Sequence, residues 1–251
     1  IREGNNMTAT SFSEATFNAT VANINGGVSG LSTKLGELHT GVSSFLSSSW
    51  VPGWVKDIVS PAFDKIYNAM SEFLGKLKEL LEGVAAPVLF FKRAWDWSDG
   101  VKAPMMDLND AVSEKRLIDQ DSWEGKGYRA YKKAVSDQSE AAKAIGDIGH
   151  GMSVSLGACA VSGAAFYVAL GVIIYECVSV LVASIVAIGS GVFTAPGLAM
   201  LATDITITAA QVWAVVGTLA ASLAAQAGSM IGMKNALDAF PGNQWPAATR
   251  E

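Results

Sequence analysis

The chain has 251 residues, of which 50% are hydrophobic and 16% charged, so it is more apolar than an average soluble protein. Its net charge of −5 provides no basic field to neutralise phosphates, which argues against nucleic acid as a partner. The N-terminus lacks a basic segment followed by an apolar core, so we expect no conventional signal peptide.

The first regular pattern lies between Phe17 and Phe45, where apolar residues alternate in steps of four and three. This spacing is typical of a coiled-coil seam and predicts a helix. Five glycines within it each cost about 1 kcal/mol relative to alanine, so we expect the helix to depend on a packing partner. Trp50, Pro52 and Gly53 then predict a turn, because proline lacks a backbone donor and glycine frees the backbone.

A second helix is predicted from about Ile58 to Val84, with apolar residues on one face and charges of both signs on the other. Opposite charges at helical spacing favour a solvated face over a binding site. Residues 88–97 carry an aromatic cluster, for which a core position is favoured over a partner surface or a membrane-interface belt. A third apolar stripe follows Pro104, so three helical segments are expected before the next motif.

A tryptophan and a glycine, Trp123 and Gly125, separate the third stripe from the helix that follows. Tyr128 and Tyr131 begin the apolar spacing of that next helix directly after the glycine. At these residues the sequence resembles the WXG superfamily, the small helical hairpins that type VII secretion systems export. The resemblance covers roughly residues 103–151.

The resemblance implies that Trp123 and Gly125 lie in the turn between two antiparallel helices, with the indole closing the end of the bundle. Trp50, Pro52 and Gly53 resemble a degenerate second copy of this turn, which would make the chain two tandem hairpins. Many family members also carry a tyrosine followed four residues later by an acid, and no tyrosine here satisfies that pattern. Such an export signal would then lie on a partner or on a tail outside this chain.

The most biased stretch runs from Met152 to Met233 and carries only two charged residues, Glu176 and Asp204. It contains three nearly charge-free runs, and each reaches the roughly 20 residues that cross the core of a bilayer. Glycine, alanine and serine recur at spacings that let helix backbones approach closely. Lipid or a large protein interior would solvate these helices, and composition alone leaves both possibilities open.

We expect the apolar stretch to fold as a hairpin with its turn near residues 194–204, because Pro196 and Gly197 interrupt it once. Phe193, Pro196 and Gly197 would form the membrane-facing tip of this hairpin. Asp204 would cap or begin the returning helix.

No proline lies between Trp123 and Phe193, so one continuous helix over this length is possible. Glycines at positions 146, 149 and 151 are the places where it could break into two helices. Two interpretations stay open for Glu176. As a buried acid it would be a functional group, such as one that lines a pore, whereas as an interfacial residue it would mark where an apolar run leaves lipid.

Groups for catalysis or metal binding do not converge in the sequence. The two histidines, His39 and His150, have no nucleophile motif beside them, and no zinc-ligand spacing occurs. Cys159 and Cys177 would lie about 27 Å apart on one helix and could not pair. We therefore expect no enzymatic activity, no cofactor, no metal and no small-molecule substrate.

These patterns predict an all-α fold, an elongated antiparallel helical bundle with a WXG-type turn and a long apolar helical hairpin. Residues 11–150 would form an amphipathic bundle, residues 151–235 the apolar hairpin, and residues 236–251 a tail. Basic residues flank the hairpin on both sides, which suits an even number of membrane crossings.

The first functional hypothesis is an exported, self-associating helical protein, similar to a type VII secretion substrate. It would insert into or pack at a membrane through its apolar hairpin, with pore formation as one outcome. Its partners would be lipid and a second copy or another helical protein, and it would be secreted or membrane-associated without a conventional signal peptide. The alternative is a soluble homo-oligomer or filament subunit whose apolar helices form the assembly interior. A second alternative is the targeting domain of a polymorphic toxin with its catalytic region beyond Glu251.

Overall fold

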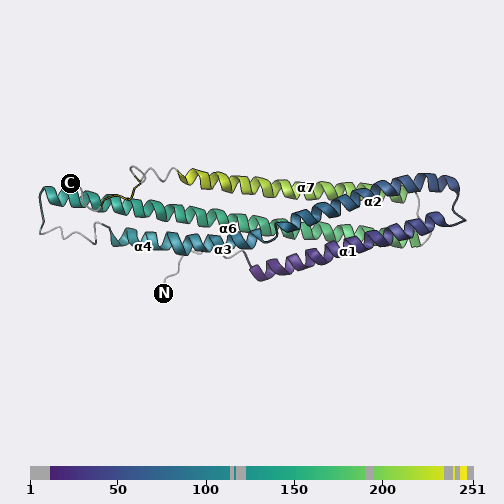
Figure 1. The fold of residues 1–251 in the computed structure, drawn as a ribbon, viewed down its shortest axis with the longest axis horizontal. Helices are drawn as coiled ribbons and strands as arrows, with labels where there is room; N and C mark the ends of the chain where they lie inside the picture. Colours follow the sequence, from purple (N-terminus) through teal and green to yellow (C-terminus); the bar gives the residue numbers. More distant parts are fainter. Residues whose placement is uncertain are drawn as a thin grey trace. The chain divides into compact units, whose positions relative to one another are not determined.

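The computed structural model describes residues 12–113, 116, 123–189, 195–234, 240 and 244–247, with the side chains of 188, 189 and 195–200 left out. The predicted all-α fold is confirmed, since the described residues form helices and no strand. The helices in chain order are α1 (Glu14–Ser47), α2 (Gly53–Glu82), α3 (Ala86–Trp97), the π-helical turn η2 (Ser98–Lys102), α4 (Ala103–Ala111), α6 (Lys126–Gly189) and α7 (Ala195–Gly232) (Figure 1).

The helices belong to two compact units, each of which combines segments that are far apart in the sequence. The first unit comprises Ile1–Phe12, Pro87–Val161 and Ser222–Glu251, and the second comprises Ser13–Ala86 and Ser162–Ala221. The units do not follow the boundary expected near residue 150. Each unit contains one part of the amphipathic segment and one part of the apolar hairpin.

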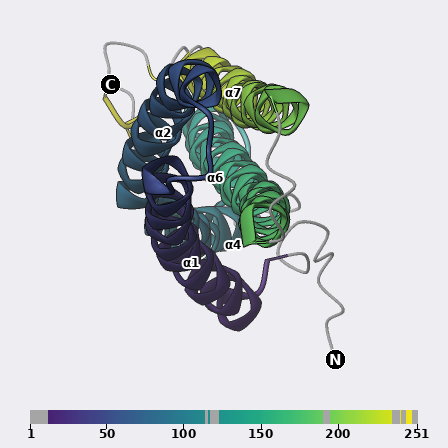
Figure 2. The ribbon, with the colours of Figure 1, turned by 90° about the vertical axis from the view of Figure 1, so that its right-hand side faces the viewer.

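In the second unit, α1 and α2 form an antiparallel pair (Figure 2). Ser13 caps α1, because its side-chain oxygen accepts a hydrogen bond from the backbone N–H of Thr16. The predicted seam of α1 is largely confirmed, since it contributes a row of buried apolar side chains at the expected spacing. These are Phe17, Ile24, Val28, Leu31, Leu35, Leu38 and Val42.

The last part of α6 packs against α1 through two glycines. A Cβ atom on Gly27 would lie only 2.7 Å from Cγ2 of Ile174, and a Cβ on Gly171 would lie 3.4 Å from Cγ1 of Ile24. The two contacts advance together along both helices, so α1 and α6 run in the same direction here. Gly27 therefore weakens α1 as an isolated helix but allows close packing in the folded unit.

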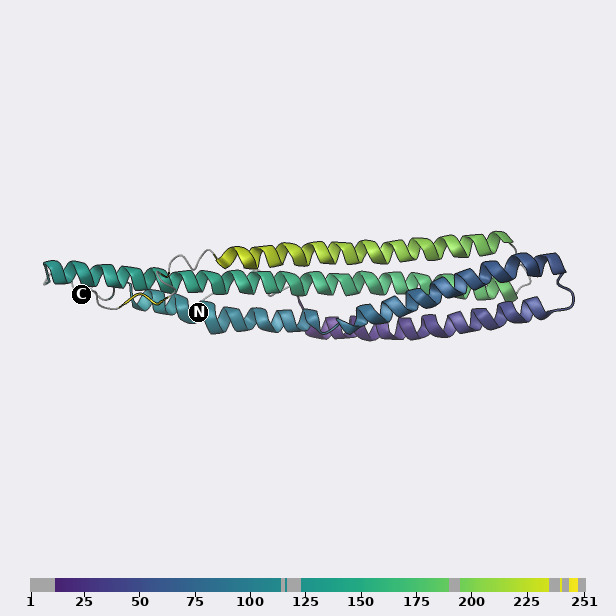
Figure 3. The ribbon, with the colours of Figure 1, turned by 45° about the horizontal axis from the view of Figure 1, so that its top comes forward.

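Tyr167 ties α6 to the other two helices of the second unit. Its hydroxyl donates a hydrogen bond of 3.0 Å to the carbonyl of Leu80 on α2, and its ring meets Phe17 of α1 edge to face. A buried phenol needs such a partner, because an unpaired buried hydroxyl would cost free energy. Within this unit the first part of α7 lies alongside α6 (Figure 3).

In the first unit, α3, η2 and α4 follow one another and run antiparallel to the first part of α6. Asn109 accepts a 2.7 Å hydrogen bond from the hydroxyl of Ser139, and further along α6 Gly149 lies against Lys102. The end of α7 also meets α6 in this unit, where Ser155 and Ser229 are 3.4 Å apart. The helices are thus held by close backbone approach and a few polar contacts.

The possibility of one long helix after Trp123 is confirmed, because α6 runs unbroken from Lys126 to Gly189. The glycines that could have broken it instead lie where other segments come closest. A Cβ on Gly146 would meet Met106 at 2.8 Å, and a Cβ on Gly151 would meet Met233 at 2.5 Å. Packing of neighbours against these positions compensates for their low helix propensity.

We predict that Gly149→Ala destabilises the protein by about 1–3 kcal/mol, because overpacking against a rigid neighbour strains the structure. The new Cβ would lie 2.8 Å from the backbone nitrogen of Lys102, and backbone cannot move aside as a side-chain end can. Gly157→Ala on the same helix is the matched control, since nothing lies within 4 Å of the Cβ that alanine would add there. It should stabilise by about 0.5–1 kcal/mol through helix propensity. Equal shifts of both variants in chemical unfolding would contradict the packing at Gly149.

The expected turn at residues 194–204 is wrong in its extent. Helix α7 begins at Ala195, so Pro196 and Gly197 lie in its first turn and Asp204 lies within the helix rather than at its start. Proline is well tolerated in a first helical turn, because its missing N–H would have no partner there. Phe193 lies outside the described residues.

Candidate functional site

The last part of α6 presents a row of large apolar side chains to solvent. They recur in steps of four, three and seven residues, which places them on one face of the helix. We call this the α6 apolar face, and it consists of Val168, Val172, Tyr175, Val182 and Val186. Contiguous exposed apolar surface of this kind marks a site for lipid or for another protein.

Helix α7 is even less covered than α6. From residue 201 to the end of the second unit, α7 buries only Leu201, Ile205, Thr208 and Val212, while Ile207 and Trp213 are exposed. Only 6% of its most apolar 18-residue window is buried. A core helix of a soluble protein would be mostly covered by its neighbours.

Two described helical stretches are long and apolar enough to cross a membrane by length and composition, Lys126–Ala187 and Leu201–Gly232. A crossing needs about 20 apolar residues, so either stretch exceeds the requirement. Tyr175 and Trp213 add exposed aromatic rings to the apolar surface, with 74% and 59% of their surface accessible.

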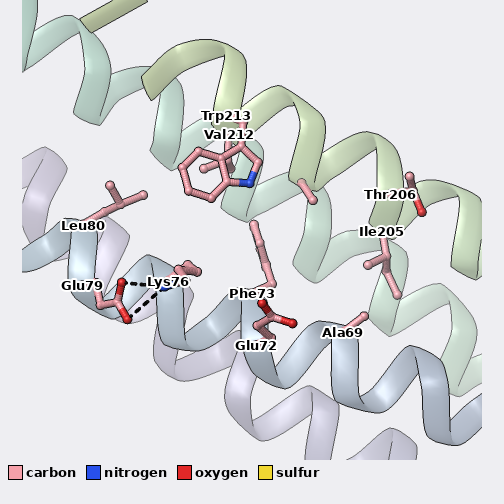
Figure 4. A pocket seen from close by; sticks show the side chains of 11 residues that line it. Ala69, Glu72, Phe73, Lys76, Glu79, Leu80, Ile205, Thr206, Val212 and Trp213 are labelled. Carbon is pink, nitrogen blue, oxygen red and sulfur yellow. Dashed lines mark hydrogen bonds and ion pairs between the residues drawn. The ribbon is translucent and has the colours of Figure 1, made fainter. Parts of the chain in front are cut away.

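A groove of about 480 Å³ separates α2 from α7 in the second unit (Figure 4). Its α2 wall carries Glu72 and the ion pair between Lys76 and Glu79, whose Nζ and Oε2 are 3.0 Å apart. Its α7 wall carries Ile205 and Trp213. Space that side chains leave unfilled contributes no dispersion energy, so α7 is held loosely along this side.

The prediction of Glu176 as a buried acid is wrong for this structure, because its side chain is exposed. It lies on α6 between the exposed Tyr175 and the buried Cys177. The carboxylate therefore interrupts the exposed apolar surface instead of the core. Its hydration explains how a charged residue is tolerated in the middle of an otherwise apolar helix.

The motif at Trp123 shows one expected feature and lacks another. Gly125 has a φ of +102°, a conformation that side-chain-bearing residues rarely adopt, directly before α6 begins. Trp123 is 45% exposed, so the expectation that its indole closes the end of the bundle is wrong. The indole instead contacts the rings of Tyr128 and Tyr131, with centroid distances of 5.9 and 5.3 Å.

We predict that Gly125→Ala costs about 1–2 kcal/mol, because alanine at positive φ is strained. Trp123→Ala should cost about 1 kcal/mol, which is the scale of an aromatic contact beyond area burial and well below that of a buried tryptophan. Chemical unfolding of both variants measures the difference. A cost above 3 kcal/mol for Trp123→Ala would show that the indole is buried after all.

The other proposed turn separates α1 from α2. Helix α1 ends at Ser47, Pro52 occupies the N-cap position of α2, and Gly53 is the first residue of that helix. Trp50 is exposed and its ring lies 5.4 Å from that of Phe45. These positions are those of a helix–helix connection, as the residue types imply.

The histidines and cysteines do not form a reactive site among the described residues. No group of three or more His, Cys, Asp or Glu side chains could hold a metal in that part of the chain. His39 packs against the rings of Phe63 and Tyr67, and His150 is exposed. Cys159 and Cys177 are buried as free thiols.

Sequence reasoning missed the exposure of Trp54 and Trp213 and the groove beside α7. Apolar periodicity identifies which residues share a helix face but not whether another helix covers that face. For Trp54 a usable signal was present, because it follows Trp50 across a turn. Comparisons with protein-family models, curated proteins and solved structures found no match to this chain.

Proposed function

We propose that this chain is a membrane-inserting helical protein whose α6 apolar face and exposed α7 contact lipid. One observation carries the proposal, namely that α7 is long and apolar enough to cross a membrane while only 6% of its most apolar stretch is buried. Removing such surface from water is favourable by about 25 cal/mol per Å² of apolar area. Lipid supplies that cover without a second protein.

The opposite side of the second unit supports a sided arrangement. The exposed face of α2 carries Asp64 and Lys65. The exposed face of α1 carries Glu37, which pairs with Lys34, and many small polar residues. Charged side chains at the centre of a bilayer cost about 2.5–3.5 kcal/mol each on insertion scales. Helices α1 and α2 would therefore remain in water while α6 and α7 contact lipid.

The alternative of a soluble homo-oligomer rests on a different observation. Glu176 lies 13 residues before the end of α6, which is about 20 Å along the helix, and it belongs to the exposed surface. In hydrocarbon this carboxylate would be costly, whereas between protein copies or beside a water-filled pore it could stay hydrated. The same apolar surface would then be covered by second copies of the chain.

Export by a type VII secretion system is proposed on the sequence resemblance at Trp123 and Gly125. The antiparallel packing of α4 against α6 on either side of this motif is the arrangement that the resemblance implies. A tagged chain expressed in hosts with and without a functional type VII system tests it. Equal amounts outside both hosts would remove this part of the proposal.

Flotation with phosphatidylcholine vesicles, followed by protease digestion, tests membrane insertion. We expect the chain to float with the vesicles and to retain a protected fragment within residues 152–233. Size-exclusion chromatography without detergent then compares the membrane protein with the soluble homo-oligomer. We expect the chain to aggregate in this experiment and detergent to reverse the aggregation. A monodisperse assembly that neither floats nor protects this fragment would instead support the soluble homo-oligomer.

A further inference from the structure

The turn between α1 and α2 holds three large apolar side chains in water. Trp50 and Trp54 are 66% and 68% exposed, and Ile58 is 51% exposed. We call these three residues the aromatic tip. Trp54 and Ile58 are four residues apart on α2, so they share one face of its first turns. Single exposed apolar residues are ordinary, but three large ones at one turn form a patch.

The exposure of the aromatic tip is fixed by the turn that carries it. Val51, between the two tryptophans, is 4% exposed and anchors the turn in the core. The Nζ of Lys56 donates a 3.2 Å hydrogen bond to the carbonyl of Ser48, and the backbone N–H of Val51 donates to the same carbonyl at 3.3 Å. These contacts hold the turn, and with it the aromatic tip, in a defined position in the second unit.

The aromatic tip lies at the end of the second unit where α6 ends. Contacts of Gly171 with Ile24 and of Gly27 with Ile174 set α1 and α6 parallel and in register. Ile24 of α1 is therefore level with Gly171 of α6. Eighteen residues further along both helices, Val42 of α1 is level with Gly189, the last residue of α6. Helix α1 continues five residues further, or about 8 Å, to Ser47. The turn therefore projects beyond α6 at that end (Figure 1).

We propose that the aromatic tip is a second lipid-contacting site, which docks in the interfacial region of a bilayer. Tryptophan favours this region, because its apolar body enters the acyl boundary while its N–H stays hydrated. Lys56 and Asp57 beside the tip balance in charge, so it fits zwitterionic phosphatidylcholine without anionic lipid. The inference rests on the proposed function and adds a lipid contact outside α6 and α7.

Partitioning into phosphatidylcholine vesicles tests the aromatic tip, with Trp50→Ser/Trp54→Ser as the variant and Trp95→Ser/Trp245→Ser as the control. The control removes two tryptophans that are also partly exposed, both in the first unit. We expect the tip variant to bind the vesicles at least about tenfold more weakly than the unmodified chain. The variant lacks the two indoles, each of which would bury apolar area in the bilayer on docking. The control should bind like the unmodified chain. Added salt should change the affinity of the chain for these vesicles by less than about twofold, because the charges of Lys56 and Asp57 balance and phosphatidylcholine is zwitterionic.

Depth-dependent quenching by brominated phosphatidylcholine supplies a second readout that folding defects do not mimic. The unmodified chain should lose fluorescence most with bromines near the headgroups, and the tip variant should lose this shallow component. Equal affinity and equal shallow quenching of the two double variants would overturn the inference while leaving insertion of residues 152–233 intact. Failure of the unmodified chain to bind vesicles would instead defeat the proposed function. A tip variant that changes only the oligomer size would assign the tip to contacts between copies.

Discussion

Val182→Lys is expected to weaken binding of the chain to phosphatidylcholine vesicles by about 100-fold, because a lysine inside a bilayer costs roughly 2.5–3.5 kcal/mol. Val182 belongs to the α6 apolar face and is 40% exposed, so the lysine can extend into water in the absence of lipid. It lies seven residues before the end of α6, which is about 10 Å along the helix. The folded chain in water should therefore keep its stability while lipid binding is lost.

Vesicle flotation over a lipid titration measures this change, and thermal unfolding without lipid checks the fold. Ser32→Lys is the matched control, because Ser32 is exposed and lies on α1, which contributes no residue to the α6 apolar face. It adds the same charge and should leave vesicle binding within about twofold, since surface charges alter stability and binding little. Equal binding of the Val182 and Ser32 variants would contradict contact between the α6 apolar face and lipid.

Leu170→Ala is expected to destabilise the second unit by about 2–5 kcal/mol, the cost of a cavity left by a buried leucine. The Leu170 side chain has 0% exposure, whereas Val168, two residues earlier, is 53% exposed. Val168→Ala therefore supplies the control, with an expected change of at most about 0.5 kcal/mol. Urea unfolding followed by circular dichroism gives both values.

The difference between the two destabilisation free energies, at Leu170 and at Val168, tests the packing of α6 more strictly than either value alone. If both faces of α6 were covered by protein in solution, the two truncations would cost similar amounts. A cost below 1 kcal/mol for Leu170→Ala would mean that α6 does not pack in the second unit as described.

Helix seams were predictable because periodicity is local. The steps of four and three residues from Phe17 are confirmed as the buried stripe of α1, and the absence of proline after Trp123 allowed the unbroken α6. Pro196 was misread as a break, since a proline ends a helix only in its interior and not in its first turn. Local pattern does not distinguish these two positions.

The features that were missed depend on contacts between distant segments. From the sequence, Gly149 is only a residue of low helix propensity. The close approach of Lys102 in the folded chain shows that a side chain at this position would not fit. In the same way, Trp123 and Val51 are both apolar residues at turns, yet one is exposed and the other buried. The candidate lipid surface could be named as an apolar stretch, but its exposed face required the other helices to be placed.

The interleaved composition of the second unit constrains how the chain folds during synthesis. Ile24 lies on a segment made early, and its partner Gly171 emerges only after the entire middle of the chain. At about 5–20 residues per second, the seam of α1 waits roughly 7–30 seconds for α6. Contacts of such large sequence separation also slow folding, because a long loop must close before they form. The α1–α2 pair must therefore survive as a partly covered intermediate, during which chaperones or a membrane can bind the seam.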